Sequence, residues 1–143
     1  MNELNATFNW IKDKIQFYEY EDKLEKTEYF FELHEIKTGA FSIIGNSKVT
    51  IDNKSDTQIF VLPIHKILDI HFQLDDENKD IMLLIIKANS EDSEYPFLID
   101  DEHQSKFFVF TLHEYLNEEK MQERFTNAFN NLIKYNRDRK SVV

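Results

Sequence analysis

The spacing of hydrophobic and polar positions changes twice along this chain. Apolar residues recur every three or four positions from Phe8 to Tyr18, which predicts a helix over residues 5–18. From residue 28 to residue 112 the chain consists of short apolar or alternating stretches, which predict about seven β-strands. A second helical pattern occupies residues 118–136.

Three strands have the clearest patterns. Residues 29–33 and 70–74 alternate apolar and polar side chains, as half-buried strands do. Residues 81–86 form an unbroken apolar run, which predicts a central strand buried on both faces. Residues 106–112 give the last strand. Pro63 cannot donate a hydrogen bond to a neighbouring strand, so a strand ends there and residues 63–66 form a single helical turn.

The turns have to be made largely without glycine and proline, because the chain has two of each. Asparagine, aspartate and serine tolerate left-handed backbone and form local hydrogen bonds, so they can take this role. The predicted turns are Asn46–Ser47 and residues 52–56, 75–79 and 89–93.

The closing helix has the strongest amphipathic pattern, with an apolar stripe formed by Met121, Phe125, Ala128, Leu132 and Tyr135. Asn117 is its predicted N-cap. Burial contributes about 1.5–3 kcal/mol for each large apolar side chain, so this helix is expected to be part of the core. The predicted fold is a single mainly-β α+β domain over residues 1–143. Its antiparallel strands form a curved sheet or partly open barrel, closed by the C-terminal helix, with an extra helix at the N-terminus.

Two segments have patterns that are similar to those of a known fold. The first is Val49-x-Ile51 followed by Pro63-Ile64-x-x-Ile67-x-x-Ile70, and the second is Arg124-Phe125-x-x-Ala128-Phe129-x-x-Leu132-Ile133. Over residues 28–136 the chain resembles small bacterial members of the pleckstrin-homology-like superfold. The resemblance implies two near-orthogonal antiparallel sheets closed by one helix. It does not imply lipid-headgroup binding, because Lys37, Lys48 and Lys54 are widely spaced where such members cluster their basic residues.

The charge distribution argues against two classes of partner. The net charge is −10, and residues 75–102 contain ten acidic residues and two lysines, a net charge of −8. Nucleic acids and anionic membranes both attract basic surfaces, so neither is an expected partner. The chain has no cysteine, no signal-peptide pattern and no long apolar run, which together predict a cytoplasmic protein without disulfides.

No motif indicates catalysis, a metal or a cofactor. The five histidines are scattered and none is spaced as a metal-ligand pair. The acidic stretch of residues 100–103 is predicted to be a charged loop. Asp76-x-Asn78-x-Asp80 begins like a calcium loop but lacks its glycine and its final glutamate. There is no GxSxG sequence, and Gly39 and Gly45 are isolated, so no phosphate-binding glycine loop exists.

Two groups of residues are candidates for an interaction surface. Trp10 and Phe17 lie on the helix face opposite the apolar stripe, where they could form a homodimer or partner contact. The favoured alternative is that this helix ends early or lies between the sheet and the closing helix. The second group is an acidic rim that would attract a basic protein: Asp75, Asp76, Glu77, Asp100, Asp101 and Glu102.

These observations favour a non-enzymatic acidic binding module that acts through protein–protein contacts. An alternative is a small intracellular inhibitor, such as an immunity protein that neutralises a basic toxin. An acidic secretion chaperone ranks lower, because it requires a helix between the strands. An apolar ligand pocket among the phenylalanines is a further possibility left open by the sequence.

Overall fold

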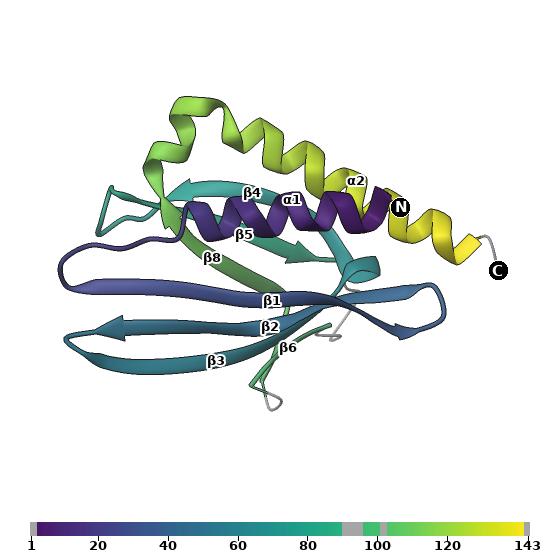
Figure 1. The fold of residues 1–143 in the computed structure, drawn as a ribbon, viewed down its shortest axis with the longest axis horizontal. Helices are drawn as coiled ribbons and strands as arrows, with labels where there is room; N and C mark the ends of the chain where they lie inside the picture. The colour runs from purple at the N-terminus through teal and green to yellow at the C-terminus, as the bar shows by residue number, and fades with distance from the viewer. Residues whose placement is uncertain (1–2, 90–95, 101–102, 142–143) are drawn as a thin grey trace.

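The computed structural model describes residues 3–89, 96–100 and 103–141. Its antiparallel strands form two sheets (Figure 1). The larger sheet has five strands, in the order β1 (Glu25–Lys37), β2 (Ala40–Ile51), β3 (Lys54–Pro63), β6 (Phe97–Ile99) and β7 (His103–Ser105). The smaller sheet has three strands, in the order β4 (Ile67–Leu74), β5 (Ile81–Ala88) and β8 (Phe107–His113).

Two α-helices cover one side of these sheets (Figure 1). The helices are α1 (Glu3–Phe17) and α2 (Met121–Ser141), and they contact each other. Two short 3-10 helices join the elements: η1 (Ile64–Lys66) links the two sheets, and η2 (Glu114–Glu119) leads into α2.

The core lies between the inner faces of the two sheets and under the two helices. Phe60 of the larger sheet packs against Phe108 of the smaller sheet, with ring centroids 4.4 Å apart. From α2, Phe125, Phe129 and Leu132 are fully buried in the same cluster. The closing helix is therefore part of the core, as its apolar stripe predicts.

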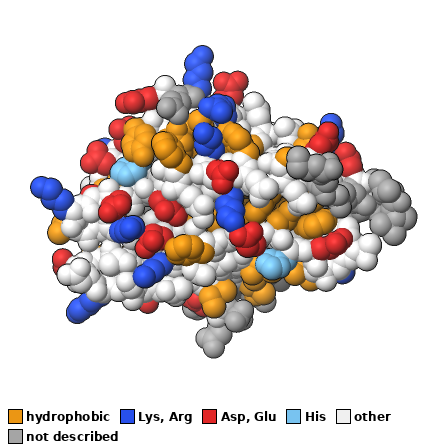
Figure 2. Space-filling model, viewed as in Figure 1, with side chains coloured by type: hydrophobic (Ala, Val, Ile, Leu, Met, Phe, Trp, Pro, Cys, Tyr) orange, Lys and Arg blue, Asp and Glu red, His pale blue; other side chains and the backbone are white. Residues whose placement is uncertain are grey.

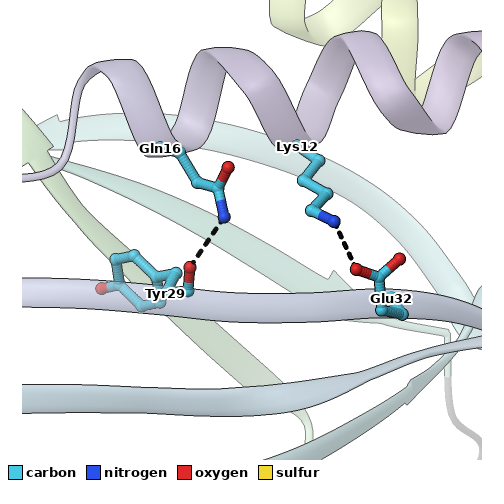
Figure 3. A network of polar contacts seen from close by, with 4 residues as sticks. All are labelled: Lys12, Gln16, Tyr29 and Glu32. Carbon is cyan, nitrogen blue, oxygen red and sulfur yellow. Dashed lines mark hydrogen bonds and ion pairs between the residues drawn. The ribbon is translucent and has the colours of Figure 1, made fainter.

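Helix α1 lies along the free edge of β1, where an edge strand would otherwise present unpaired backbone groups (Figure 3). The Gln16 side-chain amide donates a hydrogen bond to the Tyr29 carbonyl at 3.1 Å. The Tyr29 amide donates to the Glu19 carboxylate at 2.6 Å. Lys12 forms an ion pair with Glu32 across the same edge. These side chains take the place of a neighbouring strand.

The segment after α1 connects the two sheets at one end. Its Tyr20 amide donates to the Thr111 carbonyl of β8 at 3.3 Å, and its Tyr20 carbonyl accepts from the Thr27 amide of β1 at 2.9 Å. The Tyr29 hydroxyl of β1 also accepts a hydrogen bond from the Thr111 amide, at 2.6 Å. The two sheets are thus joined by hydrogen bonds as well as by packing.

The predicted mainly-β α+β class is confirmed, with an N-terminal helix, a C-terminal helix and no closed barrel. β5 lies between β4 and β8, as the apolar run predicts, but it is fully buried on one face only, because Leu83 and Ile85 on the other face are partly exposed. The predicted single turn after Pro63 is confirmed as η1. The turn near residue 52 is reduced to Asp52 and Asn53, whose φ angles of 51° and 65° match the primed turns that suit a right-twisted hairpin.

Two local predictions are wrong. Asn46–Ser47 is not a turn but the middle of β2, because β1 and β3 pair with β2 continuously on both sides. Asn117 does not cap α2, which begins at Met121 after the left-handed Lys120. Asn117 lies in η2, and its carbonyl accepts a hydrogen bond from the Lys120 amide.

Candidate functional site

The outer face of the larger sheet carries a group of apolar side chains, which we call the apolar sheet face. It consists of Phe30, Ile44, Ile59, Val61 and Leu98. Phe30 and Ile59 are 50% and 45% exposed, and the other three side chains are partly buried. Large exposed aromatic and aliphatic side chains that cluster in this way are typical of protein-binding surfaces.

The strand register brings these residues together from four strands. Phe30, Asn46 and Ile59 form one cross-strand row. Ile44, Val61 and Leu98 form the next row, beside Glu32. Diagonal neighbours in successive rows are about 7–8 Å apart, within reach of large side chains, so Phe30 can meet Ile44 across the two rows.

Gly45 allows β1 and β2 to approach closely beneath this face, because it has no side chain. A Cβ atom at Gly45 would lie 2.1 Å from the Phe30 carbonyl oxygen and 2.5 Å from the Phe31 Cβ. Neither group can move freely, because both belong to a strand paired along its length. The glycine therefore sets the backbone position that presents Phe30 outward and Phe31 to the core.

The smaller sheet also exposes apolar side chains on its outer face, over a narrower area. Phe107 is 49% exposed, Val109 is exposed, and Leu83 and Ile85 are partly buried. They come from two strands, and the aligned positions of β4 are polar. This face is the natural internal control for the apolar sheet face.

The tip of the β2–β3 hairpin forms an open hollow of about 680 Å³, which we call the hairpin trough. It is lined by residues from both strands, from the turn between them and from the position after β6: Ser47, Val49, Ile51, Asp52, Lys54, Ser55, Asp56, Thr57, Gln58 and Asp100. Its volume is within the range of ligand-sized pockets.

A smaller pocket of about 170 Å³ lies at the joint between the sheets. The His113 ring stands between Tyr20 and Tyr115, at centroid distances of 4.9 Å and 4.7 Å. Burial lowers the pKa of His113, and the carboxylates of Asp80 and Glu21 oppose that shift. The His113 Nε2 atom accepts a hydrogen bond from the Glu21 amide at 3.3 Å, so the neutral ring has a structural role there.

The loop between α1 and β1 is held by Asp22. Its carboxylate accepts hydrogen bonds from the Tyr20 hydroxyl and from the Leu24 and Glu25 amides. These bonds lower the pKa of Asp22, and the bond to Asp22 raises the pKa of the Tyr20 hydroxyl. The arrangement fixes a turn and leaves the carboxylate engaged with the protein itself.

Trp10 and Phe17 lie in different environments. Trp10 is partly buried against α2, with its ring centroid 5.5 Å from that of Phe125 and the Arg124 guanidinium 5.4 Å from its ring. Phe17 is 66% exposed at the end of α1 and packs edge-on against Tyr18. Trp10 therefore contributes to packing between the helices, whereas Phe17 is accessible.

The acidic residues selected from the sequence are not gathered in one place. Asp75, Asp76 and Glu77 lie in the turn between β4 and β5, where Asp75 accepts a hydrogen bond from the Asn78 amide at 3.1 Å. Asp100 follows β6, and Figure 1 shows that strand well apart from the β4–β5 turn. Asp101 and Glu102 lie outside the described residues.

The charged side chains do not separate into large regions of one sign on the face shown in Figure 2, where acidic and basic groups are interspersed. Among the described residues, no three histidine or acidic side chains are placed to hold a metal ion. In the same part of the chain, no helix has the length and apolar character needed to cross a membrane.

The apolar sheet face is not evident from the sequence alone. Phe30 was available as a signal, because it is an aromatic residue on the otherwise polar side of an alternating strand. The other residues of this surface could not be found in this way, since Ile59 and Leu98 are brought to the same face of the sheet only by its strand register. Comparison with known proteins gives no relative: no family model, curated protein or solved structure matches this chain.

Proposed function

We propose that this chain is a protein-binding module, acting through contacts rather than catalysis, that docks a partner on the apolar sheet face. The observation that supports this proposal is the exposure of Phe30 and Ile59 within a two-row apolar cluster spanning four strands. With strands about 4.8 Å apart, four strands span about 14 Å, enough for the central contact of a protein interface.

The partner we propose is a protein with an apolar centre and a basic rim. The chain carries a net charge of −10, which favours approach by a positively charged surface. Glu28 and Glu32 flank Phe30 on the same side of β1, although Lys12 pairs with Glu32. Binding should therefore combine apolar contact at the centre with an electrostatic contribution that added salt weakens.

The test compares two serine substitutions on opposite sheets. Phe30→Ser removes the aromatic side chain from the apolar sheet face, and Phe107→Ser removes an equally exposed one from the outer face of the smaller sheet. The tagged wild type and both variants are used to capture proteins from a lysate of the source cells, at low and high salt. Circular dichroism establishes that all three are folded.

The proposal requires that a basic protein is retained by the wild type and by Phe107→Ser, is lost with Phe30→Ser, and is released by salt. If Phe30→Ser retains the partner as well as the wild type does, the apolar sheet face is not the docking surface. Loss with Phe107→Ser alone would assign binding to the smaller sheet. If light scattering shows that Phe30→Ser disrupts self-association, the occupant is a second copy of this chain.

A further inference from the structure

The outer edge of β3 is only partly paired in the described structure. β6 pairs with Phe60 and Val61, and Figure 1 shows this short strand beside only part of β3. Asp100 forms the last hydrogen bonds to this edge, at Ile59. Its amide donates to the Ile59 carbonyl at 2.7 Å, and its carboxylate accepts from the Ile59 amide at 2.9 Å. Asp100 has a φ of 55°, which turns the chain away from β3.

Beyond Ile59, towards the hairpin tip, the edge is open. Backbone groups of alternate residues point to the same side of a strand, so Ser55 and Thr57 present their amides and carbonyls in the direction that Ile59 does. No described residue pairs with β3 on that side at residues 54–58. This edge spans about 17 Å and offers four backbone groups for hydrogen bonding.

The hairpin trough lies directly beside this open edge. Ser55 and Thr57 belong to its lining, together with the inward-facing side chains of Lys54 and Asp56. A strand added to the edge would therefore place every second side chain in the trough, while its other side chains would extend the outer face beyond Ile59.

The negative charge of the hairpin trough favours a basic strand as its ligand. Three carboxylates, from Asp52, Asp56 and Asp100, and the Lys54 ammonium group line it, a net charge of −2. A second copy of this chain, pairing through the same edge, would bring its own trough with the same net charge of −2, which disfavours self-pairing. Lysine or arginine at alternate positions of an added strand would meet these carboxylates instead.

We propose that the open edge of β3 and the hairpin trough form a second binding site, which takes an extended, basic peptide segment as an added strand. This proposal rests on the proposed function, because it takes the ligand to be a segment of a protein. It uses different residues, however. Phe30 has no part in it, so the two ideas can fail separately.

The test uses a short blocked peptide of alternating valine and lysine as the probe, with a valine–glutamate peptide of equal length as its control. Thr57→Pro removes the outward amide, and proline is tolerated at an edge position whose amide faces solvent. Thr57→Ala is the matched control, because it changes the side chain and keeps the amide. Fluorescence anisotropy of the labelled peptide measures affinity, and thermal unfolding verifies that each variant is folded.

The proposal requires saturable binding of the valine–lysine peptide to the wild type, to Thr57→Ala and to Phe30→Ser. Thr57→Pro should weaken it about tenfold, the effect of roughly one backbone hydrogen bond. The valine–glutamate peptide should not compete. Equal binding by Thr57→Pro and Thr57→Ala, or no saturable binding to the wild type, overturns the proposal.

A second measurement uses the wild type alone and does not depend on how Thr57→Pro folds. Addition of the valine–lysine peptide should shift the Ser55 and Thr57 amide resonances and slow their hydrogen exchange. Shifts that fall elsewhere and leave these two amides unchanged also overturn the proposal. Loss of partner capture with Phe30→Ser tests only the proposed function, so the two sets of results remain distinguishable.

Discussion

Replacement of Tyr29 by phenylalanine tests how the two sheets are held together. The Tyr29 ring packs edge-on against Phe110 at 4.8 Å, and its hydroxyl accepts the Thr111 amide hydrogen bond at 2.6 Å. Tyr29→Phe keeps the ring and leaves this amide without its partner. An unsatisfied polar group at such a position costs about 1–3 kcal/mol, so we expect the free energy of unfolding to fall by that amount at pH 8.

The same substitution has a pH dependence with a defined sign. Burial raises the pKa of the Tyr29 hydroxyl from 10.0 to about 12. Between these values the unfolded chain loses a proton that the native protein keeps, so native stability decreases as the pH rises. Ionisation of this single group should lower the wild type's free energy of unfolding by about 1.4 kcal/mol at pH 11 and by about 2.7 kcal/mol well above pH 12. Tyr29→Phe has no hydroxyl at this position and lacks this loss. The difference in free energy of unfolding between the wild type and Tyr29→Phe should therefore decrease as the pH rises from 8 to 11.

Urea unfolding at pH 8, 10 and 11 measures both effects. Tyr115→Phe serves as the control for loss of a hydroxyl group, because Tyr115 is exposed and the substitution should leave stability at pH 8 nearly unchanged. Equal stability of Tyr29→Phe and the wild type at pH 8 would refute the contribution of the hydroxyl contact. A stability difference that stays constant from pH 8 to pH 11 would refute the elevated pKa.

Three further substitutions test the packing. Gly45→Ala should lower the free energy of unfolding by about 1–3 kcal/mol or more, because its Cβ would lie 2.1 Å from the Phe30 carbonyl oxygen; an unchanged urea midpoint would contradict this. Phe129→Asp should prevent folding by placing an unpaired charge in the core, whereas Asn130→Asp on the exposed side of α2 should fold normally by circular dichroism. Asn136→Ala should cost about 1–3 kcal/mol in urea unfolding, because the buried Asn136 side-chain oxygen Oδ1 accepts a hydrogen bond from the Phe41 amide at 3.2 Å, while exposed Asn131→Ala should have little effect.

The long periodic elements could be predicted from the sequence because their apolar faces become buried. The stripe containing Phe125 and Leu132 identifies α2 as part of the core, and the apolar run of β5 identifies a central strand. β6 and β7 have three residues each, too few to show a period. β1 begins at Glu25 within a charged stretch, since pairing with Ile51 rather than side-chain burial extends it.

The candidate sites depend on long-range pairing, which explains why sequence reasoning placed them elsewhere. Phe30 and Ile59 are 29 positions apart in the chain and share one cross-strand row only because Asn46 of β2 pairs with both. The open edge of β3 depends on where Asp100 ends the pairing with β6. Aromatic residues and acidic clusters can be found by inspection, but the sequence does not specify which strand edges remain unpaired.

The apolar sheet face is tested most directly by photo-crosslinking in the source cells. A benzoylphenylalanine residue is placed at position 30 in one variant and at position 107 in another, two positions of nearly equal exposure on the outer faces of different sheets. The account predicts a single covalent adduct with a basic protein from position 30 and none from position 107. Adducts from position 107 alone, or from neither position, would contradict it.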